Sequence, residues 1–122
     1  MRPRDHLLVV DDDPSIRCTL ADLFMEEGYE VLQARNGAEA LAVALHTSPC
    51  AIILDLNMPV MDGAEFYREL RARGIGAPVV IVSAVNAIRA ARELGAAAGL
   101  NKPFDLDEVV ETVDALVRAP GG

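Results

Sequence analysis

The feature that most constrains the fold is a stretch near the middle of the 122-residue sequence that reads AIILDLNMPVMDG. Its first residues, Ala51–Leu54, form an unbroken apolar run, which is typical of a strand buried on both faces inside a parallel sheet. The run stops at Asp55, and Pro59 and the Asp62-Gly63 pair then favour a loop and a helix start. Asp55 is therefore expected at the carboxyl end of a central strand, where open α/β sheets bind their ligands.

The same alternation of a short apolar strand and an amphipathic helix recurs along the whole chain. Strands are predicted at His6–Val10, Tyr29–Ala34, Ala51–Leu54, Pro78–Val82 and Gly99–Asn101. Helices are predicted from Pro14 to about Glu27, between Asn36 and Pro49, from Ala64 to about Arg73, from Asn86 to Leu94, and after Asp105. This order predicts a (βα)5 fold: a doubly wound, parallel five-stranded sheet with right-handed crossovers and flavodoxin-like strand order 2-1-3-4-5.

Apolar residues at helical spacing indicate which helix faces are buried. In the helix before Pro49 the expected buried stripe is Ala38, Leu41, Ala42 and Leu45. In the last helix it is Leu106, Val109, Val110, Val113, Leu116 and Val117.

Composition restricts the class of protein. The length fits one domain, expected at residues 1–119 with a frayed tail or linker stub at 120–122. The residues are 52% hydrophobic but only 4% aromatic, so the core must be aliphatic. A net charge of −8 disfavours direct nucleic-acid binding, and no segment is apolar enough for membrane insertion. We expect a cytoplasmic protein in which Cys18 and Cys50 are plain thiols.

Polar residues end four of the five predicted strands: Asp11 and Asp12, then Asp55, Ser83 and Lys102. Because the first and third strands are neighbours in the expected order, the aspartates should converge at one edge. Two carboxylates about 4 Å apart repel by about 4 kcal/mol near a protein surface, and one lysine offsets only part of this repulsion. A few carboxylates with remaining waters are ligands that suit Mg²⁺.

Such a group of residues fits phosphoryl transfer. Asp55 can act as the nucleophile, Lys102 can neutralise developing charge, and the Ser83 hydroxyl can bond a phosphoryl oxygen. The sequence contains no glycine-rich nucleotide loop, and no other cofactor-binding residues are expected, so the phosphoryl donor must come from elsewhere.

The chain resembles, from end to end, the receiver domains of bacterial two-component response regulators. The resemblance is carried by four motifs: LLVVDDDPSIR, AIILDLNMPVMDG, PVVIVSA and NKPF. It implies a single-domain signalling protein whose Asp55 takes a phosphoryl group from the phosphohistidine of a sensor kinase or a histidine phosphotransfer protein. It also implies that Asp12 and Asp55 bind Mg²⁺ directly, Asp11 through water, and Asn57 through its backbone carbonyl.

The resemblance assigns further roles. Ser83 matches the family's switch hydroxyl, Lys102 its lysine, and Pro103 the cis-proline that follows the lysine. Ala84, a small residue, would leave room for water to reach the phosphoaspartate. The chain departs from the family at Gly99, where many members have Tyr or Phe, so coupling of the switch hydroxyl to an aromatic rotamer cannot operate as such.

The resemblance also predicts two interaction surfaces. The donor should dock on the first helix near Ile16, Arg17 and Leu20, together with the loop after Lys102. Output, in the form of changed partner binding, should use the fourth and fifth helices.

Two alternatives stay open. A haloacid-dehalogenase-type phosphohydrolase also uses a strand-ending aspartate with Mg²⁺, but its second acidic residue would be Asn57 here. A receiver-like scaffold that is never phosphorylated would bind no Mg²⁺. The leading prediction is an aspartyl-phosphate signalling domain that catalyses its own phosphorylation and dephosphorylation and is not an enzyme.

Overall fold

The computed structural model describes residues 6–58 and 60–118, which alternate strand and helix throughout. The strands are β1 (His6–Val10), β2 (Glu30–Ala34), β3 (Ala51–Asp55), β4 (Val79–Ser83) and β5 (Ala98–Asn101). The helices are α1 (Pro14–Glu26), α2 (Gly37–Thr47), α3 (Gly63–Ala72), α4 (Ala87–Leu94) and α5 (Leu106–Arg118). Pro59 and the expected domain end and tail at 119–122 lie outside the described residues.

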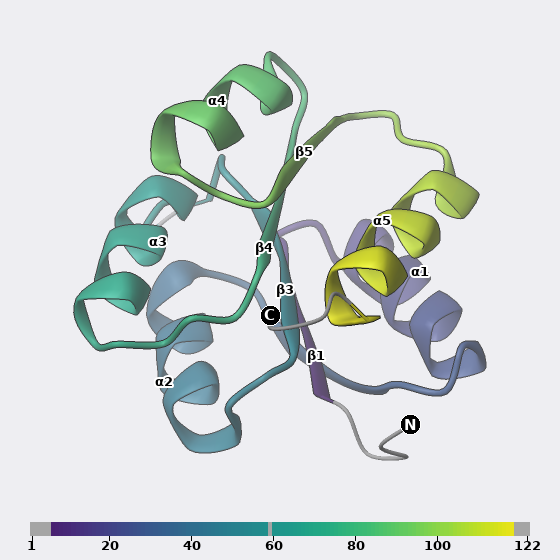
Figure 1. Ribbon diagram of the computed structural model, residues 1–122, viewed down its shortest axis with the longest axis horizontal. Helices are drawn as coiled ribbons and strands as arrows, with labels where there is room; N and C mark the ends of the chain where they lie inside the picture. Colours follow the sequence, from purple (N-terminus) through teal and green to yellow (C-terminus); the bar gives the residue numbers. More distant parts are fainter. Residues whose placement is uncertain (1–5, 59, 119–122) are drawn as a thin grey trace.

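All five strands form one parallel sheet in the order β2-β1-β3-β4-β5, which confirms the predicted topology. Helices α2, α3 and α4 cover one face of the sheet, and α1 and α5 cover the other (Figure 1). None of the helices in the described ranges has the length and apolarity needed to cross a bilayer.

Alternate strand residues supply two separate cores. Leu8, Ile52 and Ile81 pack toward α2, α3 and α4, whereas Val9 and Ile53 pack toward α1 and α5. Both faces of the central strands are thus shielded from water, which explains why their sequences are apolar without alternation.

Side-chain caps set where four helices begin. Asp13, Asn36, Asp62 and Asp105 each accept hydrogen bonds from backbone N–H groups of the first helical turn. These bonds satisfy donors that have no partner within the helix, and Asp13, Asn36 and Asp105 lie where the sequence predicts that their helices begin. Helix α4 is the exception, because Asn86, the residue before it, makes no side-chain capping hydrogen bond.

The predicted buried stripe of α2 is wrong at three of its four positions, and only Leu41 packs against the core. Ala38 and Ala42 are exposed and Leu45 is 48% exposed, whereas Gly37, Ala40 and Ala44 are the buried residues of this helix.

Close packing at the start of α2 explains the difference. The Gly37 N–H donates to the Met61 carbonyl, and a Cβ at Gly37 would lie 2.6 Å from that carbonyl oxygen. Small residues therefore face inward, and Leu41 is only partly buried. In α5 the predicted stripe is confirmed except at Leu106, which is 40% exposed in the first turn.

The corrected face of α2 can be tested with two matched substitutions. Ala40→Leu should lower the free energy of unfolding by about 1–3 kcal/mol, because the added atoms have no space against the sheet. Ala42→Leu, two residues further along on the exposed face, should change the free energy of unfolding by less than about 0.5 kcal/mol. Urea unfolding followed by circular dichroism measures the stability of both variants. If Ala42→Leu is the more destabilising substitution, the buried face is the one that the sequence predicts, and the corrected face is wrong.

Candidate functional site

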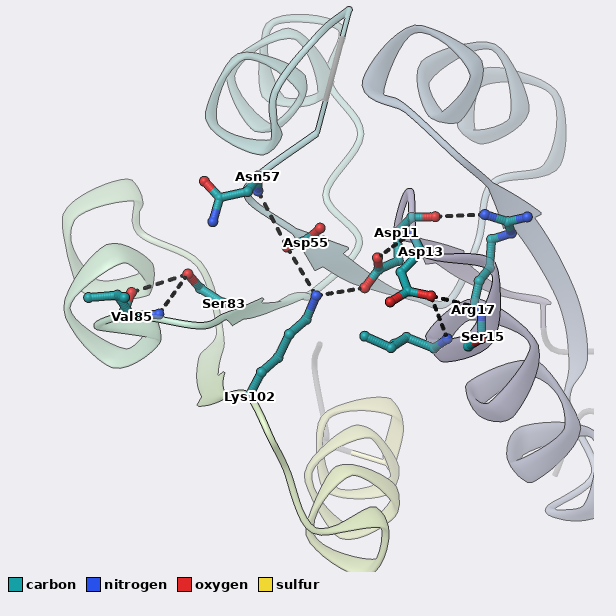
Figure 2. Close-up of polar contacts among 10 residues, drawn as sticks. Asp11, Asp13, Ser15, Arg17, Asp55, Asn57, Ser83, Val85 and Lys102 are labelled. Atoms are coloured by element: carbon teal, nitrogen blue, oxygen red, sulfur yellow. Dashed lines mark hydrogen bonds and ion pairs between the residues drawn. The ribbon is translucent and has the colours of Figure 1, made fainter.

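The polar strand ends meet at one edge of the sheet, as predicted. Val10 of β1 pairs with Leu54 of β3, so Asp11 and Asp55 follow side by side. On the other side of Asp55, Ser83 is the last residue of β4 and pairs with Asn101, the residue before Lys102. Figure 2 shows the Lys102 side chain extending from the end of β5 to the two aspartates.

Three aspartates form a cluster with the geometry of a cation site. Carboxylate oxygens of Asp11, Asp12 and Asp55 all lie within 4.8 Å of one another. Asp11 and Asp55 are buried, at 1% and 3% exposed, whereas Asp12 is exposed. A set of carboxylate oxygens with one side open to water has the donor chemistry that Mg²⁺ requires.

Lys102 neutralises only part of this cluster. Its Nζ atom lies 3.0 Å from Asp11 Oδ2 and 3.4 Å from Asp55 Oδ1. Three carboxylates against one ammonium group leave two negative charges when all are ionised. A divalent cation would balance them.

The pKa of Asp55 is raised from 3.8 to about 6. Burial is the largest cause and the charge of Asp11 the second, while Lys102 and the Asn57 N–H act in the opposite direction. Burial would lower the pKa of Lys102, but its hydrogen bond to Asp11 and the charges of both aspartates outweigh burial and raise it. Asp55 is thus mostly ionised at neutral pH, beside a firmly protonated lysine.

Backbone and side-chain donors fix the orientation of Asp11. Its Oδ1 accepts from the Asp13 N–H at 2.9 Å, while Asp13 uses its own carboxylate to cap α1 and stays outside the cluster. The Asp11 carbonyl accepts from the Arg17 guanidinium at 2.9 Å, and Arg17 is held in turn by Gln33. Arg17, which the resemblance places on the donor-docking surface, is half-buried and also supports this strand end.

Ser83 is buried at the edge, but its hydroxyl is engaged by its own turn. It donates to the Val85 carbonyl at 3.1 Å and accepts from the Val85 N–H at 3.3 Å (Figure 2). On the β3 side, the Asn57 N–H donates to Asp55 Oδ1 at 3.3 Å, and the Asn57 side-chain amide points away from the cluster. Ala84 is exposed, and the Lys102–Pro103 peptide bond is cis, as the resemblance implied.

Gly63 is a supporting residue that sequence reasoning did not assign to the site. A Cβ at this position would lie 2.6 Å from the Asp55 carbonyl oxygen and 2.7 Å from Leu56 Cα. Helix α3 therefore begins directly against the backbone that presents Asp55, and only glycine permits this approach. The Asp62-Gly63 pair in the sequence was the available signal.

The raised pKa of Asp55 predicts how stability depends on pH in metal-free protein. Between about pH 4 and 6 the folded state keeps a proton on Asp55 that the unfolded state has lost, so stability falls as pH rises. Asp55→Asn removes this loss and should raise the free energy of unfolding at pH 7 by up to about 3 kcal/mol. The gap between variant and wild type should shrink toward pH 4.

Urea unfolding from pH 4 to 8 in excess EDTA measures this gap. Asp22→Asn, at an exposed position in α1, is the matched control and should change stability by less than about 0.5 kcal/mol at every pH. An Asp55→Asn protein that is less stable than wild type at pH 7 would contradict the electrostatic account.

Comparison with known proteins gives consistent results. The response regulator receiver domain family matches residues 7–114 of the chain. The chain is 44% identical over 118 residues to transcriptional regulatory protein PrrA of Mycobacterium leprae, covering 94% of this chain and 51% of PrrA. It therefore spans about half the length of that relative. It is 36% identical to sporulation initiation phosphotransferase F of Bacillus subtilis, covering 89% of this chain and 90% of that protein.

Solved structures agree with the sequence matches. The Francisella response regulator 1452 receiver domain has a TM-score of 0.88 and 32% identity, covering 93% of this chain and 97% of that one. The Vibrio cholerae chemotaxis protein CheY4 has a TM-score of 0.85 and 32% identity, covering 93% and 98%. The chain belongs to the response regulator receiver domain family, whose members accept phosphoryl groups on an aspartate in two-component signalling.

Proposed function

We propose that Asp55 is the phosphoryl acceptor of this chain and that the donor is a protein phosphohistidine. The observation that carries the proposal is the placement of Asp55: a buried carboxylate at the end of the central strand, between Asp11 and Lys102, with one side of the cluster open through Asp12. Family membership supplies the reaction class, and this geometry supports Asp55 as the residue that reacts.

The transfer step is a displacement at phosphorus. An Asp55 oxygen attacks the phosphorus atom, a P–O bond forms, and the P–N bond to the donor imidazole breaks. The electron pair of that bond stays on the imidazole nitrogen, which takes up a proton. Ionisation of Asp55 at neutral pH supplies the nucleophile without a separate base.

Each neighbour of Asp55 has a separate role in this proposal. Asp12 and Asp55, with the Asn57 carbonyl, would hold Mg²⁺ directly and Asp11 would hold it through water; bound Mg²⁺ supplies charge neutralisation for the phosphoryl oxygens. Lys102 is already within 3.4 Å of Asp55 and pairs with the charge that the transferred group brings. Ser83 donates to a phosphoryl oxygen once its hydroxyl turns from Val85.

We propose a donor-docking surface narrower than the one that the resemblance predicts. A shallow hollow beside the site is lined by Ser15, Ile16, Thr19 and Phe104, on α1 and the segment after Lys102. Ile16 therefore stays in the proposal. Leu20 was predicted there too, but it is fully buried in the core and cannot contact a partner.

The alternative functions fit the site less well. A phosphohydrolase of the haloacid-dehalogenase type needs an acid where this chain has Asn57, whose side chain points away from Asp55. An unphosphorylated scaffold has no use for a buried carboxylate pair that destabilises the metal-free fold. We therefore propose slow self-catalysed dephosphorylation rather than turnover of small phosphate esters. A cytoplasmic location, a domain that ends near residue 119 and output through α4 and α5 stay predictions.

Intact-mass measurement tests the proposed function. With Mg²⁺ and acetyl phosphate, the chain should gain one phosphoryl group, and the adduct should be absent without Mg²⁺ and in Asp55→Ala. Asp22→Asn should be phosphorylated like wild type. An adduct that persists in Asp55→Ala would refute the assignment of the acceptor, and continuous phosphate release from a small ester would favour the phosphohydrolase.

Lys102 is the only lysine in the sequence, so its role can be tested without background from other lysines. Lys102→Met keeps most of the aliphatic stem but removes the ammonium group. Phosphorylation by acetyl phosphate at saturating Mg²⁺ should slow by roughly 10²-fold, the usual effect of losing one group that stabilises transferred charge. Quench-flow sampling with mass readout measures the rate. An unchanged rate would show that Mg²⁺ alone neutralises the phosphoryl oxygens.

A further inference from the structure

Helix α4 lacks the local cap that starts the other four helices. Asn86 precedes it in a left-handed conformation, with φ of 52°, and its side chain makes no capping hydrogen bond. The cap comes from a different strand: Asn101 Oδ1, at the end of β5, accepts from the Ala87 N–H at 2.8 Å. The first turn of α4 is thus attached to the residue that precedes Lys102.

Gly99 brings the same turn against the backbone of β5. A Cβ at Gly99 would lie 2.2 Å from the Ala87 carbonyl oxygen and 2.8 Å from the Ile88 nitrogen. Ala87 is completely buried in this contact. The position that holds an aromatic switch residue in many relatives is therefore filled here by the backbone of α4 itself.

Two short connections join this turn to the acceptor site. On one side, the Ser83 hydroxyl binds both polar groups of the Val85 backbone, only two residues before Ala87. On the other side, the Lys102 N–H donates to the Ser83 carbonyl at 2.8 Å, next to the Asn101 cap. Movement of the Ser83 hydroxyl therefore acts on the turn that Asn101 and Gly99 hold in place.

We propose that Asn101 is a positioning residue that couples the acceptor site to α4, with Gly99 providing the contact surface. In the unphosphorylated chain the cap holds the first turn of α4 on β5. When the Ser83 hydroxyl turns to the phosphoryl group, it releases Val85, the Val85-Asn86 turn shifts, and the Ala87 N–H leaves Asn101. This inference rests on the proposed function.

The surface that changes is apolar. Val85, two residues before Ala87, is 68% exposed, and Ile88, the residue after it, is 58% exposed. Release of the Asn101 cap would move both side chains together, so the phosphorylation state would be read as a change in this exposed apolar pair.

Hydrogen exchange at the Ala87 amide, measured by NMR, tests the coupling directly. In wild type, addition of Mg²⁺ and beryllofluoride should speed exchange at Ala87 at least tenfold, with core amides such as Ile53 unchanged. Asn101→Ala should show this fast exchange without beryllofluoride, and beryllofluoride should add less than twofold. Asn101→Asp keeps an acceptor oxygen and should restore both the slow basal exchange and the response.

Substitution of two glycines, one against α4 and one in open space, tests whether close packing at Gly99 holds the first turn of α4. Gly99→Ala should displace the first turn, speed Ala87 exchange and shift the Ala87 and Ile88 resonances. Gly76→Ala, where a Cβ would meet nothing within 4 Å, should leave them as in wild type.

Intact mass after acetyl phosphate treatment separates the two proposals. If wild type is phosphorylated but exchange at Ala87 does not change, or if Asn101→Ala exchanges like wild type, the coupling is refuted and the acceptor assignment stands. If neither a phosphoryl adduct nor beryllofluoride binding occurs, the proposed function fails, and the coupling fails with it.

Discussion

The central constraint on this structure is the repulsion between two buried carboxylates, which the rest of the fold must accommodate. Parallel pairing of β1 with β3 places Asp11 and Asp55 at the same strand end, where neither has free access to water. Their mutual charge and their burial raise the pKa of Asp55, and Lys102 relieves only part of the cost. A fold that keeps this arrangement gives up stability in the metal-free state, and a cation bound at the open side recovers it.

The surrounding elements hold this unfavourable arrangement in place. The Asp13 N–H and the Arg17 guanidinium orient Asp11, and the absence of a side chain at Gly63 lets α3 start against Asp55. The two apolar cores bury both faces of β3, so the strand cannot shift to separate the charges. The same rigidity would turn a small movement at Ser83 into a movement of α4. The reason is that the Asn101 cap and the close approach at Gly99 hold the first turn of α4 against β5.

Much of this was predictable because strand burial and strand ends leave clear marks in the sequence. Unbroken apolar runs identified β3 and β4, the polar residue after each run identified the site, and cap residues located the helix starts. Predictions failed where packing distance decides the outcome. Small residues of α2 face the sheet because its first turn lies against Met61, and Leu20 is a core residue although its helix borders the site.

Polar contacts between distant parts of the chain also could not be predicted from the sequence. The Arg17 bond to the Asp11 carbonyl and the Asn101 cap on α4 join elements whose relative placement appears only after folding. Gly99 was recognised as a departure from the family, but the approach of α4 that requires it was not.

The most direct test of the central claim uses the single lysine as a reporter. In protein whose lysine Cε is labelled with ¹³C, the Lys102 signal can be followed at pH 7.5, where its contacts with Asp11 and Asp55 keep the ammonium group protonated. Addition of Mg²⁺ should shift this signal in a saturable way, because the cation and Lys102 share the same carboxylates, and Asp55→Asn should weaken the response. A Lys102 signal that does not move with Mg²⁺ would show that these carboxylates do not form the cation site, and would contradict the account.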